Sequence, residues 1–431
     1  MGLSKNNRNI ILLALVFLVL ACLVVLVSPL RESLFWRADQ LITRIFYTIK
    51  QPEKAAFVPD ASAVVTVELM PTLTPTPLPT LTSTLPVEAD TPTPSPTATP
   101  LPSQVNLSGV TYIDQHGLYN YCAPANLAMA LSYWGWQGVR TDIGTQVKPN
   151  PEDFNVMPYE LVDYVNQHTA FAALHRTGGT LELVKKMVAN QYPVLIEAGR
   201  YMVDLTGKLS WMGHYTVVTG YDDASETFIT QDSYYTADYL VSYEELQNWW
   251  RPFNYVFIIV YPPDQEEQVL NLLGDYASME QSSRIAYEIA TNEVWSLTGV
   301  DQFFAWFNRG SSMVDLKDYY GAAESFDQAF LVNQGLPEGD RPWRMMWYQT
   351  GPYFAYHLTG RYQDVISLAD FTLDNARLKI LEETFVWRGR AYAALGDLNQ
   401  AHKDLCEALK NHVGFVPAQQ ELQRLGLPDC P

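Results

Sequence analysis

A segment rich in proline and threonine divides this chain of 431 residues. Ten of the 27 prolines lie between Pro71 and Pro102, interleaved with threonine and serine. Proline at this density fixes φ and removes backbone donors, so neither a helix nor a packed sheet can form there. We predict a disordered, extended linker over residues 66–106. At about 3 Å per residue it would hold a folded domain up to roughly 100 Å from a lipid bilayer.

An uncharged apolar run occupies residues 10–30. About 20 apolar residues are enough to span a bilayer. We therefore predict a transmembrane signal anchor at 10–30, with residues 1–9 cytoplasmic and a juxtamembrane segment at 31–65. The folded domains would then be extracytoplasmic, on a single-pass protein of the cell membrane. A cleaved signal peptide and a lipoprotein modified at Cys22 are the alternatives, although more apolar residues follow Cys22 where a polar tether would be expected.

The charge of the chain excludes one class of partner. There are 28 basic and 47 acidic residues, and the acidic excess lies beyond residue 107. Because phosphate binding needs clustered lysine and arginine, we expect no nucleic-acid partner. The sequence has no H-E-x-x-H or C-x-x-C pattern, so we expect no metal and no cofactor.

Residues 264–431 are predicted to be helical throughout, with an internal repeat. Gly310 and Gly389 lie at the same offset from two triplets, Ala322/Phe326/Ala329 and Ala401/Leu405/Ala408. A less regular copy lies near Gly360. These units resemble tetratricopeptide repeats, which pair two helices and stack into a concave binding surface, so we expect this domain to dock a protein partner or substrate. A helical bundle without repeats is the alternative.

Four cysteines are too few for a disulfide scaffold. Cys406 and Cys430 flank the last predicted helices. Outside the cytoplasm they could pair and pin the C-terminus, and two free thiols are the alternative.

Residues 107–263 contain the candidate chemistry, beginning with Cys122. Apolar residues at i, i+4 and i+7 mark one face of a helix after it: Leu127, Leu131 and Trp134. Pro124 suits the first turn of such a helix, which places Cys122 at its N-terminus. Unpaired N–H groups and the helix dipole favour a thiolate there, as a nucleophile requires. A small buried core cysteine is the alternative.

A hairpin predicted over residues 213–232 supplies the partners of this thiol. If it turns about Asp223, residues whose numbers add to 446 lie opposite one another, which pairs His214 with Asp232. Opposed side chains share a face with Cβ atoms about 5 Å apart. Asp232 could then accept from one imidazole nitrogen and leave the other for Cys122. A slip of one residue would separate the pair.

Two further assignments concern the groups around this pair. Gln115, seven residues before Cys122, is the candidate oxyanion donor, together with the backbone N–H of Cys122. An ordinary loop residue is the alternative for Gln115. Asp222 and Asp223 are alternative partners of the histidine, although both suit a turn better.

Three ordered blocks, Tyr119–Gly135, Gly213–Asp223 and Gln231–Tyr234, resemble the papain-like cysteine peptidases of the thirty-ninth family. That family comprises the bacteriocin-leader-processing type and its stand-alone relatives. The resemblance implies an α+β domain in which the helix carrying the cysteine packs on an antiparallel sheet. It also implies four roles: Cys122 as nucleophile, His214 as general base and then acid, Asp232 as orienter, and Gln115 as oxyanion donor.

Ala123 departs from the family pattern, which usually has glycine after the nucleophile. The spacing from Gln115 to Cys122 is also a residue or two longer than usual. We expect a membrane-anchored cysteine peptidase that hydrolyses peptide bonds in a peptide or protein substrate. A catalytically silent, peptidase-like binding module and an acyl transferase with the same triad are the alternatives.

Overall fold

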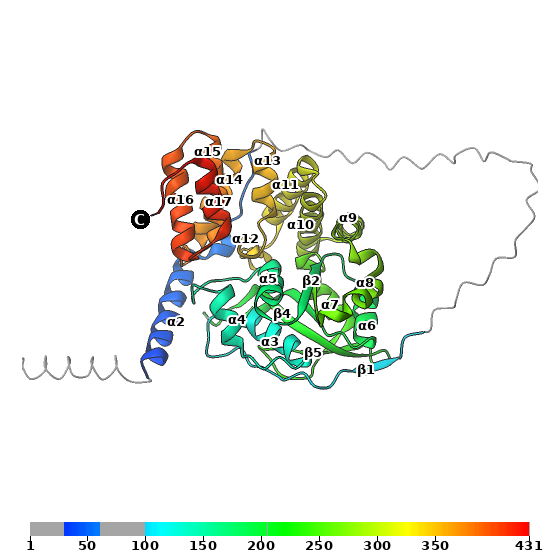
Figure 1. Cartoon of the computed structure of the whole chain (residues 1–431). Coiled ribbons are helices and arrows are strands. Elements are labelled where there is room, and N and C mark those ends of the chain that lie inside the picture. The colour runs from blue at the N-terminus through cyan, green and yellow to red at the C-terminus, as the bar shows by residue number, and fades with distance from the viewer. Residues whose placement is uncertain (1–29, 61–99, 205, 431) are drawn as a thin grey trace, which may run out of the picture.

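Figure 1 shows a computed structural model of the protein, which describes residues 30–60, 100–204 and 206–430. The predicted cytoplasmic segment, residues 10–29 of the predicted anchor and most of the predicted linker lie outside the described residues. Among the helices that are described, none combines the length and apolar character needed to cross a membrane.

One antiparallel sheet forms the centre of residues 100–261, which we call the sheet domain. Its main strands follow the order β2-β7-β3-β4-β5-β6, and β1 pairs with β4. The strands are β1 (Gln104–Asn106), β2 (Ala172–Arg176), β3 (Val194–Val203), β4 (Leu209–Asp222), β5 (Thr227–Gln231), β6 (Tyr239–Ser242) and β7 (Phe257–Tyr261). Because β1 falls inside the predicted linker, ordered structure begins before residue 107.

Helices cover both faces of this sheet. They are α3 (Cys122–Tyr133), α4 (Arg140–Val147), α5 (Pro158–His168), α6 (Leu181–Ala189) and α7 (Tyr243–Trp250), followed by the 3-10 turn η2 (Arg251–Phe253). Successive strand residues point to opposite faces, so Leu195 packs with α3 and α5 while Val194 packs with α6 and α7. The expected antiparallel sheet with helices is confirmed.

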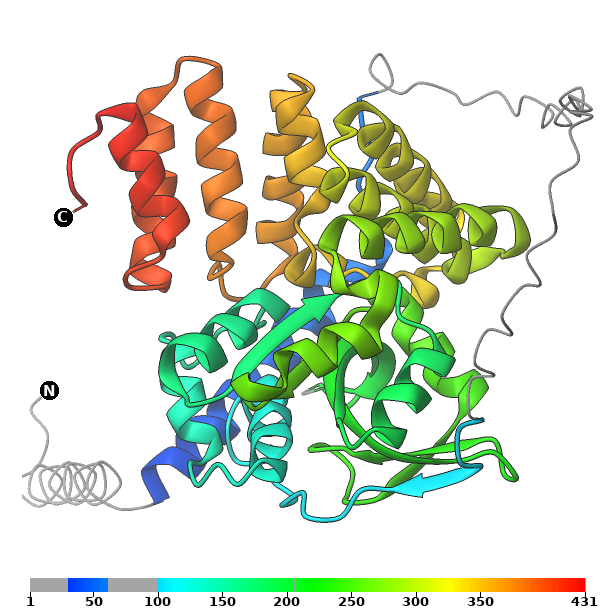
Figure 2. The same ribbon diagram turned by 45° about the vertical axis from the view of Figure 1, so that its right-hand side comes forward.

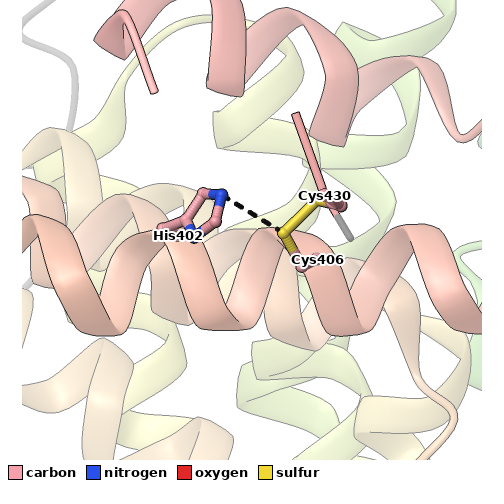
Figure 3. Close-up of side chains that lie close together, drawn as sticks. All are labelled: His402, Cys406 and Cys430. Atoms are coloured by element: carbon pink, nitrogen blue, oxygen red, sulfur yellow. Dashed lines mark hydrogen bonds between the residues drawn. A yellow bond between two sulfur atoms is a disulfide. The ribbon is translucent and has the colours of Figure 1, made fainter. Parts of the chain in front are cut away.

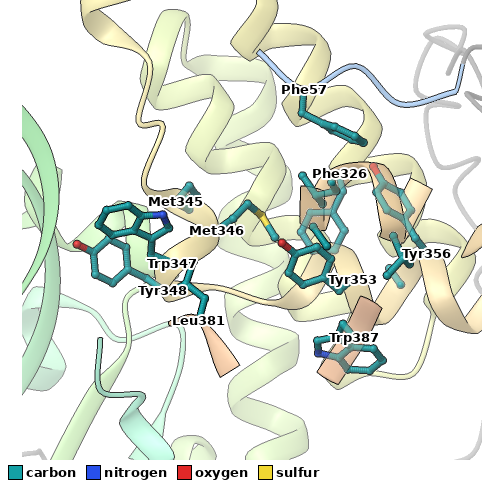
Figure 4. Packing of buried hydrophobic residues seen from close by; sticks show 14 of the residues in the cluster. Phe57, Phe326, Met345, Met346, Trp347, Tyr348, Tyr353, Tyr356, Leu381 and Trp387 are labelled. Carbon is teal, nitrogen blue, oxygen red and sulfur yellow. The ribbon is translucent and has the colours of Figure 1, made fainter. Parts of the chain in front are cut away.

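The C-terminal region is helical, as predicted. It comprises η3 (Pro263–Gln265), α8 (Glu266–Leu273), η4 (Gly274–Ala277), α9 (Met279–Ser296), α10 (Gly299–Asp315), α11 (Tyr319–Gly335), η5 (Glu338–Asp340), α12 (Met345–Tyr348), α13 (Gly351–Leu358), α14 (Tyr362–Asn375), α15 (Glu382–Ala394), α16 (Leu398–Asn411) and α17 (Val416–Leu425). We call residues 263–430 the helical region. Figure 4 shows part of its aromatic core.

The two aligned units of the sequence form the helix pairs α10–α11 and α15–α16. A Cβ on Gly310 would lie 2.8 Å from the ring of Phe326, and one on Gly389 would lie 3.3 Å from Leu405. Glycine therefore permits the close approach of both pairs. The tetratricopeptide resemblance itself stays a prediction.

Residues 30–60, which we call the N-terminal strap, pack on the helical region. They contain α2 (Leu30–Lys50) and the 3-10 turn η1 (Pro52–Lys54), and Figure 2 shows α2 in blue beside the sheet domain. The ring of Phe57 lies 4.9 Å from that of Phe330, and the backbone N–H of Asp60 donates to Asp364 at 3.0 Å.

This packing corrects the expected role of the linker. Residues 37–60 were expected to belong to a juxtamembrane segment that the linker separates from the folded domains. They are instead part of the folded body, because Tyr47 and Phe57 are buried in it. The proline- and threonine-rich segment therefore connects two parts of one body and cannot hold that body at a distance from the strap.

The helical region and the sheet domain are in direct contact. Trp211 of β4 stacks on Phe304 at 5.6 Å, and Phe154 stacks on Trp347 at 4.2 Å. Arg251 of η2 forms an ion pair of 3.0 Å with Glu293 of α9. Aromatic packing and buried ion pairs thus fix the two parts together.

A disulfide joins Cys406 of α16 to Cys430 near the C-terminus (Figure 3), so the alternative of two free thiols is not what the structure contains. His402 Nε2 lies 3.5 Å from Cys406 Sγ. Among the described residues these three side chains form the one group of potential metal ligands. Both sulfurs are consumed by the disulfide, so the group offers no site in this state.

Candidate active site

Cys122 is the first residue of α3 and, within the described part of the chain, the free cysteine. Its side chain is half-buried, and Pro124 occupies the first turn, as predicted. Burial raises the pKa of the thiol. The hydrogen bond and positive charge of His214 act against it, with help from the backbone of Tyr215 and from Lys148, and the net pKa lies below its usual value.

His214 and Asp232 meet directly, as predicted. The imidazole Nε2 lies 2.9 Å from Asp232 Oδ1, and both side chains are almost fully buried. The backbone N–H groups of Tyr234 and Tyr235 also donate to Oδ1, at 2.9 and 3.2 Å. With Nε2 on the carboxylate, Nδ1 is the nitrogen left for the thiol of Cys122.

The two pKa values are coupled through this contact. Burial lowers the pKa of His214, but the charge and hydrogen bond of Asp232, together with the hydrogen bond to Cys122, raise it by more, so the net pKa is raised. Burial raises the pKa of Asp232, yet His214 and Arg200 together hold it far below its ordinary value. The carboxylate is therefore ionised and the imidazole keeps its proton more readily than a free histidine.

The predicted register of the hairpin was wrong, although its conclusion survives. The turn lies at residues 223–226 and is not centred on Asp223. Near the turn the paired residues have numbers that add to 449. If that register continued without interruption, Asp232 would lie an odd number of residues from the position opposite His214. The two side chains would then point to opposite faces of the sheet.

A β-bulge corrects the register. Pairing shifts between Val218 and Gly220, so that Val217 lies opposite Gln231. After the shift, Asp232, the residue that follows β5, lies an even number of residues from the position opposite His214. The two side chains therefore point to the same face of the sheet. Thr219, the extra residue, is buried and accepts a hydrogen bond of 3.1 Å from Gln231 Nε2. Bulges often re-aim a side chain beside an active site, and this one delivers the histidine to its carboxylate.

Gln115 joins the same network through the residue after Asp232. The hydroxyl of Ser233 donates to Gln115 Oε1 at 2.8 Å, and the backbone N–H of Gln115 donates to the carbonyl of Ser233 at 2.9 Å. Asn126 Nδ2 lies 2.7 Å from the same hydroxyl. Because the amide oxygen is engaged, the amide N–H groups of Gln115 remain to donate, which the oxyanion role requires.

Three residues of this network escaped the sequence analysis: Asn126, Arg200 and Ser233. Asn126 lies one helical turn after Cys122 and donates to its carbonyl at 2.9 Å, so the i, i+4 spacing could have indicated it. Arg200 is a cation inside the apolar strand β3, 3% exposed, and a buried charge of that kind signals a partner. Nothing in the sequence distinguishes Ser233 from a loop serine.

The helical region reaches the site through Tyr348 of α12. A Cβ on Gly213, the neighbour of His214, would lie 2.9 Å from the Tyr348 ring. Burial raises the pKa of Tyr348 to about 12 despite Arg344 and the backbone N–H of Gly213. Its hydroxyl therefore stays protonated, and glycine at 213 gives the ring room beside the histidine.

Glu197 of β3 is the remaining acid beside the thiol. It pairs with Tyr215 across the β3–β4 ladder and is 3% exposed. Burial and the charge at Cys122 raise its pKa well above the ordinary value. Burial therefore favours the neutral form of this carboxyl over the charged one.

Comparison with known proteins finds similarity in the region that contains Cys122, His214 and Asp232. No curated protein matches the chain. A crystal structure of a candidate C39-like peptidase from Bacillus anthracis is similar, with 21% identity and a TM-score of 0.31, covering 36% of this chain and 96% of that one. The model of the Peptidase_C39 like family matches residues 107–258. Residues 107–258 are therefore similar to the Peptidase_C39 like family.

Proposed function

We propose that the protein is a cysteine peptidase that hydrolyses peptide bonds through Cys122, His214 and Asp232. One observation carries the proposal: His214 Nε2 lies 2.9 Å from Asp232 Oδ1 in a buried contact, which leaves Nδ1 of the same ring available to Cys122, the first residue of α3. A nucleophile, a base and an orienting group in this order are the parts of a covalent acyl-transfer site.

The reaction follows from these positions. His214 Nδ1 takes the thiol proton, and the sulfur of Cys122 attacks the carbonyl carbon of the scissile peptide. The amide of Gln115 and the backbone N–H of Cys122 donate to the developing oxyanion. His214 then gives its proton to the leaving amine, and the acyl-enzyme is released by water that His214 activates as a base. The net charge of −19 favours neutral or basic peptides as substrates.

The residue after the proposed nucleophile packs in the interior of the domain. Ala123 is 2% exposed and belongs to the apolar cluster that includes Leu127 and Leu195. This burial supports the proposal, because it places the methyl group of Ala123 among core side chains.

Alkylation with iodoacetamide tests the thiol directly. In a Cys22→Ser background, Cys122 should react at pH 6, because its lowered pKa leaves thiolate at that pH, and a Cys122→Ala control should not react. Reactivity that appears only near pH 8.5 would refute the enzyme proposal. Cleavage of a peptide library with and without an added amine then separates hydrolysis from acyl transfer.

We also propose that residues 10–30 anchor the chain in the cell membrane with the folded body outside the cytoplasm. Support comes from the apolar run, from the Cys406–Cys430 disulfide, which is typical of oxidising compartments, and from apolar residues exposed on α2: Leu41, Ile42, Ile45 and Ile49. The full chain should sediment with membranes after carbonate washing, and a chain lacking residues 1–29 should not. Docking of a partner by the helical region stays a prediction.

A further inference from the structure

Arg200 of β3 shares the carboxylate of Asp232 with the catalytic histidine. In the β3–β4 ladder Ala198 lies opposite His214, and Arg200 lies two residues further along, so the arginine and the histidine share a face. Arg200 Nη2 forms an ion pair with Asp232 Oδ2, while His214 Nε2 contacts Oδ1. The two oxygens of one carboxylate therefore hold a cation from β3 and an imidazole from β4.

Aromatic rings hold the guanidinium in place. Its carbon lies 4.9 Å from the ring centre of Tyr235 and 4.5 Å from that of Trp249. Arg200 Nε and Nη1 have no hydrogen-bond partner among the described residues. A cation that is 3% exposed and otherwise unpaired depends on its one carboxylate, and the aromatic faces supply the rest of its stabilisation.

We propose that Arg200 is a positioning residue, which neutralises Asp232 so that the carboxylate orients the imidazole of His214 without trapping it as an imidazolium. The inference rests on the proposed function. Two charges act on the histidine in opposite directions, since Asp232 raises its pKa and Arg200 lowers it. Without the arginine, the aspartate would stabilise the imidazolium more strongly, and His214 would give up its proton less readily.

Replacement of Arg200 by methionine gives the direct test. The measured quantity is the pH dependence of Cys122 alkylation by iodoacetamide in the full chain, with two inflections expected, the upper one reporting loss of the imidazolium proton. Removal of a cation at this range should move the upper inflection upward by about one pH unit. Arg200→Lys keeps the charge and should leave that inflection near its wild-type position.

A charge-balanced variant keeps the proposal testable if Arg200→Met folds poorly. Arg200→Met combined with Asp232→Asn removes both charges, and the upper inflection should then fall below that of Arg200→Met alone. Arg251→Met is the matched control, because Arg251 is also buried and ion-paired, with Glu293 at 3.0 Å, but lies in η2 at the domain interface. It should lower stability without moving the inflection.

The outcomes distinguish a failure of the role of Arg200 from a failure of the proposed function. An unchanged upper inflection in Arg200→Met, or an equal shift in Arg251→Met, overturns the role of Arg200. Absence of a low-pH inflection in the wild-type protein instead overturns the proposed function, because the thiol would then have no imidazolium partner.

Discussion

The sheet domain and the helical region both pair an arginine with a buried aspartate, but the two pairs differ in what they leave available. In the helical region, Arg388 Nε and Nη2 donate to the two oxygens of Asp404, each at 2.7 Å, so the carboxylate is closed by one cation. In the sheet domain, Arg200 takes one oxygen of Asp232 and leaves the other to His214. The same pair of residue types occupies both oxygens of the carboxylate in one region and, in the proposed active site of the other, leaves one oxygen to a histidine.

The largest expected contrast lies between the cysteines of the two regions. Cys122→Ala should lower peptidase activity by about 10³-fold or more, because the nucleophile is lost. The double change Cys406→Ala and Cys430→Ala, which removes only the disulfide of the helical region, should keep activity per folded molecule. Peptide cleavage at equal folded concentration measures both, and activity that survives Cys122→Ala would contradict the assignment.

The second-largest contrast is expected between Asp232 of the sheet domain and Asp404 of the helical region. Asp232→Asn should reduce kcat by about 10²-fold to 10⁴-fold, since the imidazole loses the partner that fixes its tautomer. Asp404→Asn breaks a pair in which the aspartate is buried and the arginine is partly exposed, and it should cost about 1–3 kcal/mol of stability with little change in kcat. Urea unfolding and steady-state kinetics on each variant distinguish the two effects. A fall in kcat for Asp404→Asn would mean that the regions are coupled more tightly than their contacts indicate.

Gly213 is where the two regions meet beside the histidine. Gly213→Ala should destabilise the protein by about 1–3 kcal/mol and lower activity, because its Cβ would lie 2.9 Å from the Tyr348 ring. Adding Tyr348→Ala should recover part of the loss by making room. If the double variant is no better than Gly213→Ala alone, the clash with α12 is not the cause.

The pH dependence of stability should be the smallest effect. The pKa of Asp232 is lowered on folding, so its contribution is present above about pH 4 and is lost as the pH falls further. The pKa of His214 is raised, so its contribution is full below about pH 6.5 and is lost as the pH rises through the folded value. Thermal unfolding between pH 3 and pH 9 should show the wild-type excess over Asp232→Asn greatest between those limits.

The sequence predicted those parts of the site that depend on local pattern. The helix after Cys122 follows from apolar spacing, and the contact of His214 with Asp232 follows from their parity in a hairpin. The bulge at Thr219 could not be predicted, since one extra residue in a ladder leaves no clear composition signal. The misplaced turn and the missed bulge were two errors of register that compensated for each other. Arg200 was missed because its partner, Asp232, follows β5, a strand that is not adjacent to β3 in the sheet.

The N-terminal strap shows why longer-range structure escaped the sequence. Residues 31–50 have an amphipathic composition that suits a membrane surface and a protein surface equally well. Burial of Tyr47 and Phe57 against the helical region depends on partners hundreds of residues away. No pattern within the segment specifies which surface covers it.

The strap also sets an order of events during synthesis. Asp60 and its partner Asp364 are 304 residues apart, so at 5–20 residues per second the ribosome needs roughly 15 to 60 s to deliver the second after the first. The peptidase-like domain, complete at about residue 261, emerges whole within that interval. The strap therefore stays with Tyr47 and Phe57 uncovered until the segment from α11 to α14 has been made, and a chain released early would expose them to chaperones or to other nascent chains.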